Sequence, residues 1–176
     1  LPDIQALAGC GEEQLLKLWE GLGYYNRVRN MQKAAQKIEE EYAGKFPENY
    51  EEIKALPGIG NYTAGAISSF AYGIPKPAVD GNVLRVVSRL LASDADIMKA
   101  SVRTKIENAI EPVIPEDAAS DFNQGLIELG AIVCVPNGEA KCEICPLTGI
   151  CEAKRLGIQN ELPVKKKAKA RKIEER

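Results

Sequence analysis

Four cysteines near the end of the chain, Cys134, Cys142, Cys145 and Cys151, have a spacing that could hold a metal. They form C-x7-C-x2-C-x5-C, and a fifth, Cys10, stands apart. A small secreted protein braced by disulfides would be denser in cysteine than this chain of 176 residues. Zinc usually takes two paired knuckles, and only Cys142 and Cys145 form a C-x2-C pair here. One pair with two looser thiolates suits an iron–sulfur cubane equally well, so spacing alone leaves both metals open.

Acid–base chemistry must fall to carboxylates, lysines, tyrosines or water, because the chain has no histidine. Asp80, in "PKPAVDGNVLRVVSRLL", lies between an extended stretch and a helix start. Its simplest role is an N-cap, with Gly81 in the turn. Alternatively its carboxylate, oriented by Asn82, could stabilise positive charge developing on a sugar. Arg85 and Arg89 share one helix face, where they would either contact a nucleic-acid backbone or only solvate that face.

A glycine-containing turn precedes this stretch, in "LPGIGNYTAGAI" at positions 56–67. Pro57 would end one short helix, while Gly58 and Gly60 permit positive φ and close approach of a partner. Backbone N–H groups at the start of the next helix would then form a site for a phosphate oxygen. An ordinary helix–helix turn carries equal weight, because short glycine patterns recur by chance.

These residues must be positioned by helices, because β-branched alternation is nearly absent and apolar residues recur at helical spacing. Helices are expected over about 12–20, 26–42, 62–72, 82–91, 101–111 and 116–129, with one short helix before position 56. The fold class is therefore all-α. The sequence contains no apolar run long enough to span a bilayer and no signal segment, so we expect a soluble, cytosolic protein without a membrane partner.

The net charge of −2 argues weakly against nucleic acid, although the placement of charge matters more than its sum. The chain begins with Leu1 and ends in the charged, apolar-poor "VKKKAKARKIEER". We expect it to be a piece of a longer protein, cut at both ends.

Taken together and in this order, "GLGYYNRVRN", "LPGIGNYTAGAI", "AVDGNVLRV" and the four-cysteine loop resemble the helix-hairpin-helix DNA glycosylases, in particular their adenine-specific branch. The resemblance extends over about residues 1–157. It implies base-excision repair by hydrolysis of the N-glycosidic bond of adenine paired with 8-oxoguanine or guanine, after the base is flipped out of the duplex. It also implies a [4Fe–4S] cluster, double-stranded DNA as the partner, a monomer, and a cytoplasmic, nucleoid-associated location in a bacterium.

The resemblance gives each motif a role. Asp80 would be the catalytic aspartate, with Asn82 beside it. The four cysteines would hold the cluster, which would brace a DNA-contacting loop. Tyr24 would be the wedge that enters the duplex beside the oxidised guanine. The hairpin and nearby groups would contact DNA through Tyr24, Leu56, Gly58, Ile59, Gly60, Thr63, Arg27, Arg29 and Arg85, with Arg89 as a further candidate.

Two alternatives remain open. An endonuclease III-like pyrimidine glycosylase with lyase activity carries a Schiff-base lysine in the hairpin helix, where this chain has Tyr62. Its motif also resembles "DTH" where this chain has "DGN". We therefore count Tyr62 among the catalytic positions of a monofunctional enzyme. The other alternative is a non-catalytic DNA-binding or zinc-braced module, against which Asp80 beside an intact hairpin argues.

The chain also departs from the family. The general-acid glutamate would precede Leu1, and the C-terminal domain that recognises 8-oxoguanine would follow the basic tail. Because leaving-group protonation contributes roughly 10²–10⁴ in rate, we expect this chain to be nearly inactive and to bind DNA weakly. The first cysteine gap is x7 where x6 is typical, an insertion that the turn "PNG" can absorb.

Three segments are expected. Residues 1–76 would be part of a helical barrel that ends in the hairpin, and residues 77–157 would hold the Asp80 helix and the cluster loop. Residues 158–176 would be a basic linker or tail. Asp80 would then lie at the mouth of the cleft between the two lobes.

Overall fold

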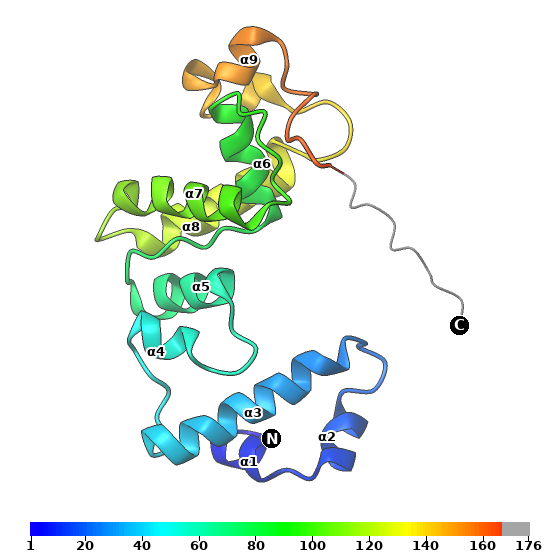
Figure 1. Cartoon of the computed structure of the whole chain (residues 1–176), viewed down its shortest axis with the longest axis vertical. Helices are drawn as coiled ribbons and strands as arrows, with labels where there is room; N and C mark the ends of the chain where they lie inside the picture. Colours follow the sequence, from blue (N-terminus) through cyan, green and yellow to red (C-terminus); the bar gives the residue numbers. More distant parts are fainter. Residues whose placement is uncertain (167–176) are drawn as a thin grey trace. The chain divides into compact units, whose positions relative to one another are not determined.

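The computed structural model describes residues 1–166, which form helices and turns with no strand among them. The predicted all-α class is therefore confirmed. The chain divides into two compact units, one ending at Ala78 and the other beginning at Val79, and each is described by itself (Figure 1). None of the helices in the described range is long and apolar enough to cross a membrane.

The first unit contains α1 (Ile4–Gly9), α2 (Glu12–Leu18), α3 (Tyr25–Tyr42), α4 (Tyr50–Lys54) and α5 (Asn61–Tyr72). The long helix α3 is amphipathic, and it buries Val28, Ala35 and Ile38 on one face. Helix α1 packs along α3. The Gln32 side chain ties the two together by donating to the carbonyl of Cys10 at 2.6 Å.

Helices α4 and α5 pack against each other on either side of the glycine turn. Their small core contains Ile53, Leu56 and Ala64, all at most 2% exposed. Asn49 caps α4 by accepting a bond from the N–H of Glu51 at 2.9 Å. The turn between the helices is thus anchored on both sides by buried apolar contacts.

The second unit contains α6 (Gly81–Leu90), α7 (Ala100–Ile110), α8 (Ala119–Glu128) and α9 (Glu152–Leu156). A π-helical turn (Leu129–Val133) continues α8, and 3₁₀ turns lie at Glu111–Val113, Cys142–Ile144 and Thr148–Ile150. Helix α6 lies at the centre of this unit, where it contacts α7, α8, the π turn and α9. The core is formed by Val79, Val83, Leu84, Val87, Ile97, Ile106, Ile110, Ile114 and Ala119.

The predicted helices are present, with ends shifted by at most three residues. The largest shift is in α8, which begins at Ala119 rather than near 116. Helices α1, of six residues, and α9, of five, were not predicted. Part of the expected linker packs against the second unit: Leu162 is 6% exposed and the Val164 carbonyl accepts a bond from Ile97 N–H at 3.1 Å. The expectation for residues 167–176 lies outside the described residues.

Candidate functional site

Asp80 is the N-cap of α6, and its two carboxylate oxygens have different partners. Oδ1 accepts the backbone N–H groups of Asn82 and Val83, at 2.8 and 2.9 Å. Oδ2 accepts the side-chain Nδ2 of Asn82, at 2.8 Å. The carboxylate is therefore held rigidly at the positive end of a helix, which stabilises its negative charge. The cap predicted as the simplest role is present, and it also orients an anionic group.

Asn82 connects this carboxylate to a buried arginine. Its Oδ1 accepts a bond from Nη2 of Arg85 at 2.8 Å. The same guanidinium donates to the carbonyl of Gly130 at 2.6 Å and, through Nε, to the carbonyl of Cys134 at 2.7 Å. Burial first, and the neighbouring positive charge second, lower the pKa of Arg85 from its usual value. A continuous chain of hydrogen bonds thus links Asp80 to the first cysteine of the cysteine loop (residues 134–151).

A second buried arginine contacts the cysteine loop directly. Arg89 donates from Nη1 to the Cys134 sulfur at 3.2 Å and to the Val135 carbonyl at 3.0 Å. Its Nε donates to the carbonyl of Leu162 at 2.9 Å. One helix face therefore holds both the start of the loop and the segment that follows it.

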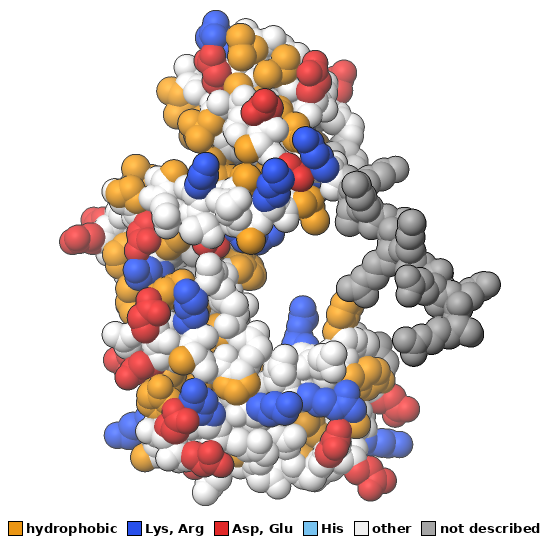
Figure 2. Space-filling model, viewed as in Figure 1, with side chains coloured by type: hydrophobic (Ala, Val, Ile, Leu, Met, Phe, Trp, Pro, Cys, Tyr) orange, Lys and Arg blue, Asp and Glu red, His pale blue; other side chains and the backbone are white. Residues whose placement is uncertain are grey.

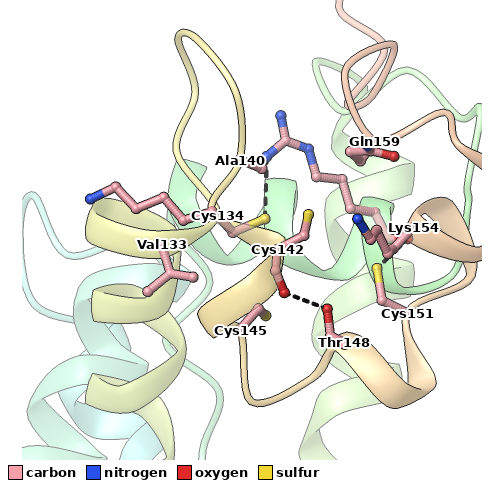
Figure 3. Close-up of a pocket in the computed structure, with 11 residues that line it drawn as sticks. Val133, Cys134, Ala140, Cys142, Cys145, Thr148, Cys151, Lys154 and Gln159 are labelled. Carbon is pink, nitrogen blue, oxygen red and sulfur yellow. Dashed lines mark hydrogen bonds between the residues drawn. The ribbon is translucent and has the colours of Figure 1, made fainter.

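The four cysteines that were predicted to bind metal line one small cavity (Figure 3). Their sulfur atoms are arranged around a common opening, and Arg89, Lys154 and Gln159 complete the wall. Two side-chain interactions help to hold the surrounding loop: Thr148 Oγ1 donates to the Cys142 carbonyl at 2.6 Å, and Lys154 pairs with Glu143 at 3.0 Å.

Over residues 1–166, no group of three or more cysteine or acidic side chains is placed to hold a metal ion. A tetrahedral zinc would bring its thiolates to about 3.8 Å from one another, given Zn–S bonds of about 2.3 Å. In a cubane cluster each thiolate binds a different iron, so the sulfurs stand further apart. Burial and then, more weakly, the neighbouring sulfurs raise the pKa of the Cys142 thiol, against a lowering by Lys154. A cationic group bound among these sulfurs would favour the thiolate form of Cys142 and so oppose this rise in its pKa.

The glycine turn of the first unit has the conformation expected of a hairpin. Gly58 has φ +78°, and a Cβ there would lie 2.5 Å from Asn30 Cβ, so both backbone angle and space require glycine. Gly60 is the N-cap of α5 and supplies no side-chain cap. Tyr62 and Thr63, in the first turn of α5, are exposed. The turn therefore presents backbone and small polar groups to solvent.

A second exposed feature is the loop that precedes α3. Tyr24 is 84% exposed and has the left-handed φ of +48°. The Arg27 guanidinium lies 5.9 Å from the centre of its ring. Arg29 pairs with Glu12 at 3.0 Å and so joins α3 to α2. Basic side chains gather over α3 in the surface view (Figure 2).

Three predicted contact residues occupy positions that prevent a side-chain contact with a ligand phosphate. Arg85 and Arg89 are each 4% exposed, and their donors bond to backbone carbonyls of the second unit. Leu56 is 2% exposed and belongs to the core between α4 and α5. In "NVLRVVSRLL" apolar residues flank Arg85 on both sides and follow Arg89, which is a sequence signal that this helix is largely buried.

The role of Gly130 was not predicted from the sequence. A Cβ at this position would lie 2.5 Å from Asn82 Cβ, so only glycine allows the π turn to reach α6. The π turn becomes visible only in the structure. There it marks a candidate functional region, because such turns are frequent at functional sites.

The fold and these motifs define a class: the chain belongs to the HhH-GPD superfamily of base excision DNA repair proteins, whose family pattern matches residues 1–112. Among curated relatives, it is 40% identical over 162 residues to the adenine DNA glycosylase of Homo sapiens, covering 92% of this chain and 30% of the relative. It is also 40% identical over 152 residues to the adenine DNA glycosylase of Buchnera aphidicola subsp. Acyrthosiphon pisum, covering 86% and 43%. The chain thus spans less than half the length of these two relatives.

Solved structures show the same fold. A thermostable thymine-DNA glycosylase superposes with a TM-score of 0.77 at 25% identity, covering 89% of this chain and 71% of the other. A non-covalent endonuclease III–DNA complex superposes with a TM-score of 0.74 at 28% identity, covering 90% and 72%.

Proposed function

We propose that this chain is the catalytic part of an adenine DNA glycosylase, which hydrolyses the N-glycosidic bond of adenine paired with 8-oxoguanine or guanine in double-stranded DNA. The observation that carries the proposal is the Asp80 carboxylate, fixed by three hydrogen bonds at the start of α6. The relatives with 40% identity that are named adenine DNA glycosylases support the choice of base.

The proposed role of Asp80 follows from the departure of adenine from the deoxyribose. As adenine departs, positive charge develops on the deoxyribose, and a preorganised carboxylate stabilises that charge without reorganising. In this chain Oδ1 of Asp80 accepts the two N–H groups of the helix start, whereas Oδ2 accepts the side chain of Asn82. We propose that Oδ2 stabilises the developing positive charge and that Asn82 orients the carboxylate. Base flipping must precede this step, because adenine inside a duplex is shielded.

Binding of the DNA backbone is assigned to the first unit. The exposed first turn of α5 has the polarity that binds a phosphate, and the basic side chains of α3 add longer-range attraction. Tyr24 has the size and exposure of an inserted wedge. Arg27 is exposed beside it.

The cysteine loop fits a [4Fe–4S] cluster. Four cysteine ligands around one opening, with an N–H donor to the Cys134 sulfur, are the donor set such a cluster takes. When bound, the group would act as a structural cross-link of the loop. Arg85 and Arg89 would transmit the position of that loop to α6, because both bond to it and belong to that helix.

The structural similarity to endonuclease III supports a second candidate, a glycosylase with lyase activity. Lyase chemistry requires an amine that forms a Schiff base with the sugar. Tyr62, exposed at the second position of α5, offers a phenol instead. We therefore favour the monofunctional enzyme.

A single-turnover assay on a duplex with adenine opposite 8-oxoguanine tests the proposal, with hot alkali revealing abasic sites. Slow release of adenine by the wild-type chain, and none by Asp80→Asn, is the expected result, because leaving-group protonation contributes much of the normal rate. Strand cleavage at thymine glycol without alkali would favour the second candidate. Binding of the duplex with no base release would limit this chain to DNA recognition and contradict its being catalytic by itself.

A further inference from the structure

We infer that Trp19 is a positioning residue that holds the wedge loop (residues 19–24) in the conformation that projects Tyr24. The inference rests on the proposed function, since it assumes that Tyr24 inserts into DNA. Neither the sequence motifs nor the comparisons give Trp19 a role.

Trp19 closes the wedge loop by two hydrogen bonds. Its indole Nε1 donates to the carbonyl of Gly23 at 2.8 Å, and its own carbonyl accepts the N–H of Leu22 at 3.2 Å. The bonded carbonyl belongs to the residue directly before Tyr24. The peptide plane that sets the backbone angle of Tyr24 is therefore fixed by the indole.

The indole is itself held in place. Trp19 is the C-cap of α2, and its backbone N–H bonds to the Leu15 carbonyl. Its side chain lines an apolar hollow together with Leu15 and Val28, which are 2% and 3% exposed. The indole that bonds to Gly23 is thus fixed against the core formed by α2 and α3.

The indole bond matters because the backbone of Tyr24 is unfavourable, with φ of +48°. Gly21 and Gly23, at φ of +86° and +68°, adopt positive φ without this cost. For a residue with a Cβ, the left-handed conformation costs about 1–2 kcal/mol. Tyr24 also gains little from burial, since it is 84% exposed, and Leu22 beside it is 65% exposed. Without the indole bond, the wedge loop would sample other conformations, and DNA binding would have to supply the ordering free energy.

Binding measurements with Trp19→Phe test the inference, because phenylalanine keeps an aromatic ring but removes the N–H donor. We expect about threefold to tenfold weaker binding to a duplex with 2-aminopurine opposite 8-oxoguanine, the range that one hydrogen bond contributes. The fluorescence rise of 2-aminopurine on unstacking should shrink in parallel. Gln32→Met is the matched control, because it removes a side-chain bond to backbone in the same unit, away from the wedge loop.

A double-mutant cycle separates positioning from simple stability. If Trp19 acts through Tyr24, Trp19→Phe should have almost no further effect in a Tyr24→Ala background. Equal effects of Trp19→Phe in both backgrounds would overturn the inference while leaving the proposed function intact. An unchanged affinity of Tyr24→Ala would instead remove the wedge, and with it this inference.

The wild-type chain offers a test without any variant. Trp19 is the only tryptophan, so its indole N–H gives a single resonance in an NMR spectrum. We expect that proton to exchange with solvent at least tenfold more slowly than a free indole N–H. Rapid exchange in the folded chain would overturn the inference, whatever the binding results.

Discussion

Arg85 donates from Nε to the main-chain carbonyl of Cys134 at 2.7 Å, although 49 positions separate the two residues. The same side chain reaches Asn82, which in turn holds the Asp80 carboxylate. Disturbance of the cysteine loop should therefore reach the Asp80 carboxylate through bonded atoms. This relationship makes the cysteine loop part of the support of the site rather than a separate module.

Replacement of Asp80 can separate its two roles. Asn is as good an N-cap as Asp, so Asp80→Asn should change the free energy of unfolding by less than about 0.5 kcal/mol. It should lower the rate of adenine release by roughly 10² or more, because the compensating charge is lost. Asp80→Ala should lose the cap as well, at about 1 kcal/mol. Thermal melts beside single-turnover rates check this, and equal rates for Asp80→Asn and wild type would contradict it.

Removal of the Arg85 guanidinium should destabilise the second unit. Arg85→Met would leave the carbonyls of Gly130 and Cys134 buried without that donor, at about 1–3 kcal/mol. Iron content after purification should fall with it. Arg103→Met is the control, because the bond from Arg103 to the Val79 carbonyl in the same unit is longer, at 3.4 Å. Comparable denaturation midpoints for the two variants would contradict the prediction.

The salt dependence of DNA binding should distinguish exposed from buried arginines. Arg27→Gln should reduce the slope of log K against log salt by about 0.9, the value of one lost phosphate contact. Arg89→Gln should leave that slope unchanged in molecules that remain folded, because the Arg89 side chain is buried. Fluorescence anisotropy over a series of salt concentrations measures both. A smaller slope for Arg89→Gln would mean that its guanidinium reaches DNA after all.

Gly130 and Gly125 form a matched pair for testing the approach of the π turn to α6. Gly130→Ala would place its Cβ 2.5 Å from Asn82 Cβ, so Asn82 must move and Asp80 loses its side-chain partner. We expect lower stability and lower base release. Gly125→Ala in α8 meets no atom within 4 Å and should stabilise the helix by up to about 1 kcal/mol. Loss of activity in both variants would indicate a general effect on α8.

The cysteine loop should take up iron. Anaerobic reconstitution should load about four irons per chain, with visible absorption of the bound cluster. Cys142→Ala should abolish that loading, whereas Cys10→Ser should not, since Cys10 lies in the first unit outside the four-cysteine loop. Tight binding of one zinc per chain, with no iron loading, would contradict the cluster assignment.

Much of this arrangement could be predicted from sequence, because local patterns carry it. The extended stretch before "DGN" predicted the Asp80 cap, and the glycines of "LPGIG" predicted a turn with positive φ at Gly58. The spacing of the four cysteines alone predicted that their side chains lie close together. The burial of Arg85 and Arg89 could not be read in this way, because their acceptors come from Gly130, Cys134 and Leu162, far along the chain. The Trp19 bond was not predicted because its acceptor is a backbone carbonyl. Every residue has such a group, so the sequence does not show which one accepts a bond.

The distance along the chain between α6 and its acceptors also sets an order of assembly during synthesis. Asp80 leaves the ribosome early, but Arg85 must wait for Gly130, 45 residues later, and Arg89 for Leu162, 73 residues later. At about 5–20 residues per second, the second interval is about 4–15 s of translation. A nascent chain therefore carries Asp80 before Arg85 and Arg89 have reached their distant acceptors. A polypeptide released before Gly130 would keep the local bonds of Asp80 to Asn82 and Val83, but it would lack the bonds through which Arg85 ties Asn82 to the rest of the second unit.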